Sequence, residues 1–307
     1  MLHYTGTHPA LITPFRDGEV DEDALRALVD RVIEGGVDGL VPCGTTGESV
    51  TLSPAEQLRV VAIVVDEARG RVPVTAGAGC ASTRHTIELA KGARSAGADG
   101  LLLVCPYYNR PTQAGLEAHY RAVLAEVPLP SILYNIPGRT GVDLSVDTLE
   151  RLADVPALVA IKEATGNVLR AQEILARLGD RFSVLSGDDA LTVPVLGVGG
   201  HGVVSVTANA FPREVSEVTR RYLGGETVAA RAAHRRLLPV HRAMFVESNP
   251  GPIKAVLADA GHIAPEVRLP LVWPTEVSVA HLRATLAAAG LSSEAPAPSP
   301  FAVAASR

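Results

Sequence analysis

Residues Leu158–Glu163 read LVAIKE, a run of four apolar residues that ends in a lysine and a glutamate. The apolar residues do not alternate with polar ones, as they do in a strand with one face in water, so the run predicts a strand covered on both faces. Seven other short runs share this pattern, and each is followed by a turn and a stretch of helical periodicity. The eight predicted strands are Ala10–Thr13, Val37–Pro42, Val72–Ala76, Gly100–Cys105, Ser131–Asn135, Leu158–Lys162, Phe182–Ser186 and Gly202–Thr207. Eight such units predict an α/β fold, a closed (β/α)8 barrel of the TIM type.

Helical signals fill the segments between and after these runs. Ser53, Pro54 and Glu56 have the spacing of a capping box at the start of a helix. From Pro212 to about Ala289 the pattern is helical, with no strand between. We therefore divide the chain into a barrel over 1–211, a C-terminal helical extension over 212–291 and a tail over 292–307. The Ala, Ser and Pro content of the tail predicts disorder.

The composition excludes several classes of protein. With 47% apolar residues the chain can bury a large core, and a net charge of −5 without a long basic run argues against a nucleic-acid partner. Apolar stretches such as Val60–Val65 are far shorter than the roughly 20 residues that span a membrane. Met1–Pro9 lacks the pattern of a signal peptide, and Cys43, Cys80 and Cys105 are too few for a disulfide framework. We therefore expect a cytoplasmic protein that binds neither membrane nor nucleic acid.

Two apparent ligand motifs have simpler explanations. GVGGHG at Gly197–Gly202 fits the dinucleotide pattern G-x-G-x-x-G, but it precedes a predicted strand, whereas that motif follows a strand and opens a helix. Asp188 and Asp189 suggest a metal site, but a helix N-cap accounts for them. The nine histidines show no zinc-ligand spacing, so we expect neither a metal nor another cofactor.

Lys162 is the candidate nucleophile, because it stands at the C-terminal end of a predicted strand, where barrel enzymes carry their catalytic groups. The chain has 25 arginines and only three lysines. Arginine cannot lose its proton, whereas a desolvated lysine can become a free amine that attacks a carbonyl. A pair with Glu163 is the simpler alternative, weakened because neighbouring strand residues point to opposite faces. We expect Lys91 and Lys254, away from any strand end, to be ordinary solvated charges.

Polar groups follow three other predicted strands. The GTTGE turn at Gly44–Glu48 offers amides and hydroxyls to a carboxylate or phosphate, although a capped turn entering a helix explains it equally well. Three of the six tyrosines, Tyr107, Tyr108 and Tyr134, stand near two strand ends, where they either carry protons or plug the barrel rim. Arg139 either binds a substrate carboxylate or forms a surface salt bridge. With the lysine, these groups are the parts of a Schiff-base lyase or aldolase that acts on a keto acid.

Five separated motifs occur in the order found in a known family. They are GTTGE at Gly44–Glu48, YYNRP at Tyr107–Pro111, YNIPGRTG at Tyr134–Gly141, IKEATGN at Ile161–Asn167 and SGDD at Ser186–Asp189. From about Leu11 to Leu291 the chain closely resembles dihydrodipicolinate synthases, the lysine-pathway branch of the pyruvate-dependent lyases that include N-acetylneuraminate lyase. The resemblance implies a Schiff-base-forming carbon-oxygen lyase. Such an enzyme condenses pyruvate with aspartate 4-semialdehyde to 4-hydroxy-tetrahydrodipicolinate, in lysine and diaminopimelate biosynthesis.

The resemblance also implies a role for each matching catalytic residue. Lys162 forms the imine with pyruvate, and Tyr134 is the general acid and base beside it. Thr45 and Tyr108 complete a proton relay to solvent, with Tyr108 reaching into the active site of a neighbouring subunit. The catalytic unit of the family is a tight homodimer, usually paired into a homotetramer, so the same assembly is implied here.

Four further residues are implied to hold the substrates. Thr46 binds the pyruvate carboxylate, Gly187 and the backbone of Val204 line the pocket, and Arg139 receives the carboxylate of aspartate 4-semialdehyde. Relatives that cleave sialic acid carry serine then threonine in the turn and lack the PGRTG stretch, so this sequence favours the synthase. Two alternatives stay open: an aldolase or dehydratase for a sugar-derived keto acid, which needs no Arg139, and a non-catalytic keto-acid sensor.

Feedback inhibition by lysine is expected to be weak or absent. Many plant and Gram-negative members of the family bind lysine at the dimer interface through a polar cluster that includes an asparagine and a glutamate. Those two positions are Ala81 and His85 here, although Ser49 and Tyr107 remain. Without the carboxylate, the α-amino group of lysine lacks its charged partner. Steady-state assays with added lysine should show little loss of rate, and tight inhibition would contradict this prediction.

Overall fold

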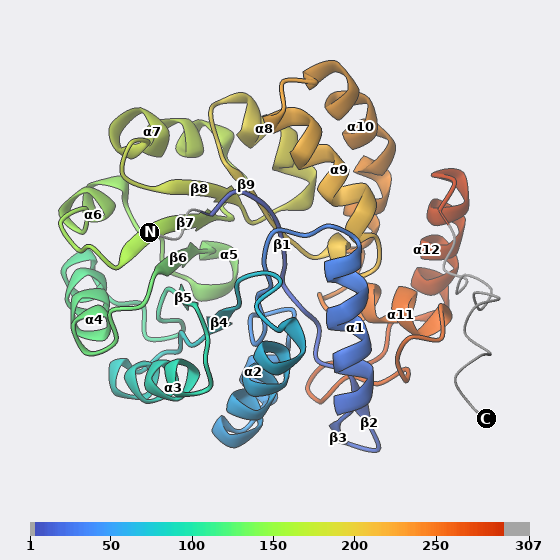
Figure 1. Ribbon diagram of the computed structural model, residues 1–307, viewed down its shortest axis with the longest axis horizontal. Coiled ribbons are helices and arrows are strands. Elements are labelled where there is room, and N and C mark those ends of the chain that lie inside the picture. The colour runs from blue at the N-terminus through green and yellow to red at the C-terminus, as the bar shows by residue number, and fades with distance from the viewer. Residues whose placement is uncertain (1–3, 292–307) are drawn as a thin grey trace.

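The computed structural model describes residues 4–291 and places seven parallel strands in one sheet, in the order β1-β9-β8-β7-β6-β5-β4. The strands are β1 (Gly6–Pro9), β4 (Thr75–Gly77), β5 (Gly100–Val104), β6 (Ser131–Asn135), β7 (Leu158–Glu163), β8 (Ser183–Ser186) and β9 (Gly202–Ser205). Figure 1 shows the strands curled around the centre of the molecule, with helices outside them. The predicted α/β barrel is confirmed.

The eighth position in the barrel is filled by a very short extended segment. The predicted strand Val37–Pro42 pairs through two isolated parallel bridges, Ala10 with Val41 and Leu40 with Val74. Backbone hydrogen bonds run on both sides of it, from Val41 N to the carbonyl of Pro9 and from Leu40 N to that of Pro73. The sheet therefore closes, although the predicted strand was too long.

The first strand also lies earlier than predicted. Instead of Ala10–Thr13, the chain pairs over Gly6–Pro9, where polar residues concealed the strand in the sequence. Thr7 and His8 are nevertheless buried, and each has a polar partner: the hydroxyl of Thr7 lies 2.9 Å from that of Thr219, and His8 Nε2 lies 2.9 Å from the carbonyl of Thr5. A short hairpin of β2 (Phe15–Arg16) and β3 (Glu19–Val20) follows.

The helices around the sheet match the predicted periodicity. They are α1 (Glu22–Glu34), α2 (Pro54–Ala68), α3 (Thr83–Ser95), α4 (Gln113–Glu126), α5 (Pro137–Thr140), α6 (Val146–Arg151), α7 (Val168–Leu178), α8 (Thr192–Gly197) and α9 (Pro212–Leu223). At the start of α2, Ser53 and Glu56 exchange side-chain to backbone hydrogen bonds in both directions. This confirms the predicted capping box.

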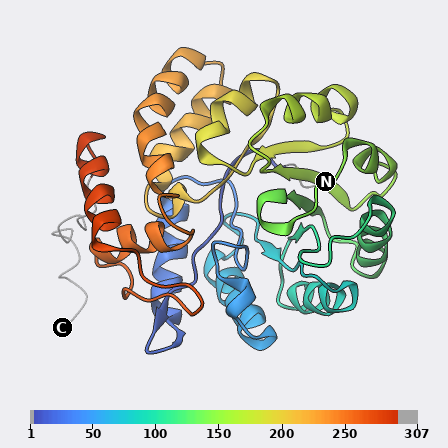
Figure 2. The same ribbon diagram turned by 180° about the vertical axis from the view of Figure 1, so that it is seen from behind.

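Three more helices complete the described chain: α10 (Thr227–Ala243), α11 (Gly251–Asp259) and α12 (Glu276–Ala288). Helix α10 packs against α9, and α12 packs against α10 and α11. Seen from behind, they lie on the side of the barrel that carries α1 (Figure 2). The domain division at 211/212 stays a prediction, and the predicted tail at 292–307 lies outside the described residues. Within residues 4–291 every helix is too short or too polar to cross a bilayer.

Alternation along β6 and β7 separates two apolar layers. Ile132, Tyr134 and Ala160 belong to the cluster inside the barrel, together with Leu102 and Leu185. The intervening residues of these strands, Leu133 and Ile161, belong to the layer between the sheet and the helices. By the same alternation, Lys162 faces the barrel interior and Glu163 faces the helices.

Lys254 is not a solvated charge, so the expectation for it was wrong. Its side chain is fully buried on α11, and its Nζ lies 2.5 Å from Glu48 Oε1, donates to the carbonyl of Glu266 at 3.0 Å and lies 4.2 Å from the centre of the Phe15 ring. Burial lowers the pKa of Lys254, and the charge of Glu48 opposes that shift. The signal was in the sequence, because nearly every neighbour on α11 is apolar. Lys91, by contrast, pairs with Glu126 at the surface, as expected.

The buried pair makes Lys254 a strong determinant of stability. Substitution Lys254→Met leaves the Glu48 carboxylate buried without its cation, so we expect the free energy of unfolding to fall by about 3–5 kcal/mol. The double variant Lys254→Met/Glu48→Leu should recover much of that loss, because no charge is then left unpaired. Denaturant unfolding measures both, with Lys91→Met as the surface control. A loss for Lys254→Met no larger than for Lys91→Met would refute this account.

Candidate active site

The register between β6 and β7 brings Lys162 beside Tyr134 at the C-terminal end of the barrel. Both side chains are almost fully buried, and Lys162 Nζ lies 3.9 Å from the centre of the Tyr134 ring. Gly187 follows β8 next to them, where a Cβ atom would come within 3.2 Å of Lys162 Cε. Val204, on β9, belongs to the same interior cluster as Tyr134. Four of the predicted site residues therefore lie together.

Burial in the barrel lowers the pKa of Lys162 to about 7. The negative charge of Asp189 opposes this shift, and the positive charge of Arg139 adds to it. In the described part of the chain no carboxylate forms an ion pair with Lys162, so desolvation dominates. A large fraction of the amine is consequently unprotonated at neutral pH, as a nucleophile requires.

Asp189 supplies the opposing charge from a fixed position. Its buried carboxylate accepts hydrogen bonds from Ser205 Oγ at 2.5 Å, Val206 N at 2.8 Å and Thr207 N at 3.2 Å. The predicted N-cap role is correct for Asp188, whose side chain caps the following 3-10 turn. The role of Asp189 was missed, because its partners come from the loop after β9, which no local pattern links to it.

Tyr134 is held as a proton donor. Burial raises the pKa of its hydroxyl to about 12, while Arg139 and a side-chain hydrogen bond with Thr45 act in the opposite direction. The hydroxyl is therefore protonated at neutral pH and linked to Thr45, which is half-buried. This arrangement joins a free amine and a phenol in one apolar enclosure, where a proton can pass between the phenol and a ligand on the amine.

The turn Gly44–Glu48 is packed tightly against the rest of the barrel. Thr46 is buried, and its Oγ1 accepts a hydrogen bond from Asn249 Nδ2 at 2.9 Å. A Cβ atom at Gly47 would lie 3.0 Å from the carbonyl oxygen of Leu11, so the turn leaves little room for a side chain there. The turn leads into a 3-10 helix at Ser49–Thr51, with Glu48 at its N-cap position but without a side-chain cap, whereas Ser53 caps α2.

A cavity of about 220 Å³ opens at this end of the barrel. Its lining includes Thr45, Tyr134 and Arg139 together with Tyr107, and Gly44, Gly77 and Gly79 keep its wall open. Lys162 lies against the ring of Tyr134, at the same strand ends. No group of three or more His, Cys, Asp or Glu residues within 4–291 is placed to hold a metal ion.

Of the predicted site residues, Thr45, Tyr134 and Arg139 line this cavity, Lys162, Thr46, Gly187 and Val204 are buried or half-buried behind its wall, and Tyr108 lies at the surface. Its side chain is 94% exposed and does not line the cavity. Its backbone has a φ of 72°, which is strained for an aromatic residue. Residues in such strained backbone conformations cluster at functional sites, where the surrounding structure holds them in place.

Arg139 lies in a loop whose first residue, Asn135, is hydrogen-bonded to its last residues, Asp143 and Leu144. Asn135 Nδ2 donates to Asp143 Oδ1 at 2.8 Å, and its Oδ1 accepts from Leu144 N at 3.1 Å. Between these points the chain forms the single turn of α5, which begins at Pro137 and carries Arg139. Arg139 itself is exposed at the cavity, so its guanidinium is available to a ligand.

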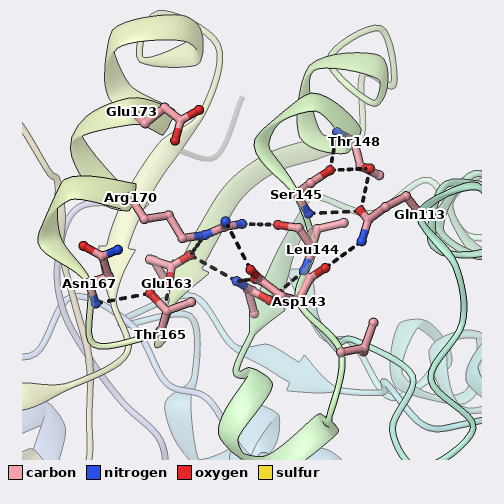
Figure 3. A network of polar contacts seen from close by, with 12 residues as sticks. Gln113, Asp143, Leu144, Ser145, Thr148, Glu163, Thr165, Asn167, Arg170 and Glu173 are labelled. Carbon is pink, nitrogen blue, oxygen red and sulfur yellow. Dashed lines mark hydrogen bonds and ion pairs between the residues drawn. The ribbon is translucent and has the colours of Figure 1, made fainter.

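The same network holds the end of β7 from outside the barrel (Figure 3). Arg170 Nε donates to Glu163 Oε2 at 3.0 Å, and its other end donates to the carbonyl of Leu144. Asn135 Nδ2 also lies 3.3 Å from Glu163 Oε2. Glu163 therefore pairs with Arg170 and not with Lys162, as the strand alternation predicted.

A lysine with a lowered pKa beside a protonated tyrosine, at the C-terminal strand ends of a barrel, defines an enzyme that forms Schiff bases with carbonyl compounds, a lyase of the class I aldolase type. The particular family follows from comparison with known proteins. The chain belongs to the dihydrodipicolinate synthetase family, whose sequence model matches residues 3–289.

Individual relatives agree with this assignment. The 4-hydroxy-tetrahydrodipicolinate synthase of Sorangium cellulosum is 58% identical over 274 residues, which are 88% of this chain and 91% of the relative. The solved structure of the enzyme from Methylacidiphilum fumariolicum SolV has a TM-score of 0.92 at 45% identity and covers 94% of this chain and 96% of that one. The dihydrodipicolinate synthase from Acinetobacter baumannii, solved with pyruvate, has a TM-score of 0.92 at 44% identity, covering 94% and 99%. The predicted family and fold class are confirmed.

The lowered pKa of Lys162 predicts how adduct formation depends on pH. Trapping with pyruvate and borohydride should become faster as the pH rises through about 7, because only the unprotonated amine attacks. Substitution Asp189→Asn removes the charge that raises the pKa, so the midpoint should move to lower pH. Asp188→Asn is the matched control and should leave it in place. A wild-type midpoint near the ordinary lysine pKa of about 10.4 would refute the desolvation argument.

Proposed function

We propose that this enzyme condenses pyruvate with aspartate 4-semialdehyde to give 4-hydroxy-tetrahydrodipicolinate, in lysine and diaminopimelate biosynthesis. The observation that carries the proposal is the buried amine of Lys162 against Tyr134, with Arg139 exposed at the cavity that Tyr134 lines. Membership of the dihydrodipicolinate synthetase family supports it, as do the relatives named as synthases of this product.

The chemistry begins at the amine. Unprotonated Lys162 attacks the carbonyl carbon of pyruvate, and Tyr134 donates the proton with which the former carbonyl oxygen leaves as water. The resulting iminium withdraws electrons, so a proton is lost from the methyl carbon to the Tyr134 phenolate and an enamine forms. The enamine carbon attacks the aldehyde of the second substrate, and Tyr134 returns the proton to the new hydroxyl. The unprotonated amino group of that substrate then attacks the iminium carbon and closes the ring, Lys162 leaves as the free amine, and the proton released returns to the Tyr134 phenolate.

The two carboxylates are assigned to different residues. Thr46 would bind the carboxylate of pyruvate, with Gly187 and the backbone of Val204 shaping the pocket around it. Arg139 would bind the carboxylate of aspartate 4-semialdehyde through its two-pronged guanidinium. Its position supports this role, because it is exposed at the cavity while both ends of its loop are fixed.

Tyr108 would complete the proton relay from Tyr134 and Thr45, in the active site of a neighbouring subunit. Its almost complete exposure in the single chain supports this, because its hydroxyl is accessible to another subunit. The proposal therefore includes a homodimer, paired into a homotetramer. From charge and composition we further propose a cytoplasmic location, with no contact to nucleic acid or membrane.

Borohydride trapping tests the proposed function. With pyruvate present, mass spectrometry of the intact wild-type protein should show one adduct, and Lys162→Ala should show none. Arg139→Ala should retain the adduct but lose about 10- to 100-fold in kcat/KM for aspartate 4-semialdehyde, because a hydrogen bond to a charged group contributes about 1.5–3 kcal/mol. An undiminished adduct on Lys162→Ala would rule out the Schiff base. Condensation that survives Arg139→Ala unchanged would instead favour a sugar-derived keto acid as substrate.

A further inference from the structure

Asn249, in the segment between α10 and α11, makes a buried contact with the active-site turn. Its Nδ2 donates to Thr46 Oγ1 at 2.9 Å across 203 positions of sequence, and both residues are at least nine-tenths buried. Nothing local in the sequence marks Asn249, since it precedes a helix far from any barrel strand. Its side chain nevertheless touches a residue proposed above to bind substrate.

The direction of this hydrogen bond determines what Thr46 can offer to a ligand. A threonine hydroxyl has one hydrogen to donate and two lone pairs to accept with. Because the Asn249 amide occupies a lone pair, the hydroxyl hydrogen must point elsewhere, and no described residue accepts it. Thr46 is thereby prepared as a donor, which is the role that an anionic ligand requires.

The segment that carries Asn249 is anchored on both sides. Two residues before it, Glu247 Oε1 accepts hydrogen bonds from the backbone and hydroxyl of Thr275, at 2.9 and 2.8 Å. On α11, Lys254 forms the buried ion pair with Glu48, which lies on the same turn as Thr46. The amide of Asn249 thus reaches the turn from a fixed backbone, and the second link prevents the turn from shifting relative to it.

We propose that Asn249 is a positioning residue for pyruvate, which directs the Thr46 hydroxyl toward the substrate carboxylate. The proposal rests on the function proposed above and extends it to a residue outside the barrel. A neutral amide suits this position, because it donates without adding charge. An aspartate would accept the Thr46 hydrogen and repel the carboxylate.

The purely structural alternative is that Asn249 only ties the C-terminal helices to the barrel. The two roles differ in the property that Asn249 affects. A structural tie changes the free energy of unfolding, whereas a positioning role changes the KM for pyruvate in protein that is still folded. A double-mutant cycle in the KM for pyruvate then tests whether the effect of Asn249 runs through the Thr46 hydroxyl.

The experiment compares Asn249→Ala, Asn249→Asp, Thr46→Val and Asn249→Ala/Thr46→Val in the full-length enzyme. We expect Asn249→Ala to raise the KM for pyruvate by about 3- to 10-fold, the size of one net hydrogen bond, with a much smaller change in kcat. The near-isosteric Asn249→Asp should raise it further. In the Thr46→Val background, the Asn249→Ala substitution should add nothing to the KM for pyruvate. Glu276→Gln, at an exposed position of α12 in the same C-terminal extension, should leave that KM unchanged.

The outcomes distinguish failure of this inference from failure of the proposed function. An additive effect of Asn249→Ala on the Thr46→Val background, or an unchanged KM for pyruvate in Asn249→Asp, overturns the positioning role. An unchanged KM in Thr46→Val overturns it too, together with the assignment of Thr46, but leaves the Schiff base in place. Absence of a borohydride adduct on the wild type overturns the proposed function itself. If Asn249→Ala does not fold, Asn249→Asp carries the test, since it preserves the shape of the side chain.

Discussion

Removal of the Lys162 amine from water is the constraint on which this site depends. The barrel interior supplies it, because the strands that surround the amine are covered by helices on one side and by their own apolar side chains on the other. Desolvation alone favours the neutral amine, and two charges adjust the balance: Arg139 in the same direction and Asp189 in the opposite one. A tyrosine whose proton is held by the same burial lies against the amine. Nucleophile and proton donor thus arise from one environment.

Successive side chains of a β-strand point to opposite faces of the sheet. The same strand ends can therefore carry reactive groups inside the barrel and a stabilising network outside it. Tyr134 and Lys162 face the barrel interior, while the residues that follow them, Asn135 and Glu163, face the helices. There they join Arg170 and the loop that carries Arg139 in one hydrogen-bonded network. Any shift of β6 against β7 would break this network, so the outer pair keeps the inner pair in register. A site that must be accurate within about 0.5 Å needs such support.

The features that could be predicted from the sequence are those that depend on residues close together in the chain. The bounds of β6, the capping box of α2 and the strand-end position of Lys162 all follow from short-range periodicity or spacing. Contacts between distant segments could not be predicted in this way. Asp189 depends on backbone amides after β9, and Asn249 meets Thr46 only because the C-terminal helices fold back to the first part of the barrel. The first strand was misplaced for a related reason, since its buried threonine has its partner on α9.

The two buried lysines show that burial alone does not make a nucleophile. Lys254 is even less exposed than Lys162, but Glu48 lies 2.5 Å from its Nζ, the carbonyl of Glu266 accepts from it and the face of Phe15 covers it. Its charge is compensated, and its amine has no free direction of approach. The carboxylate of Asp189 also acts on Lys162 electrostatically. It already accepts three hydrogen bonds, from Ser205 and from two backbone amides, and it forms no ion pair with the amine. The distance of the carboxylate, and what else it binds, therefore decide which buried lysine stabilises the fold and which one reacts.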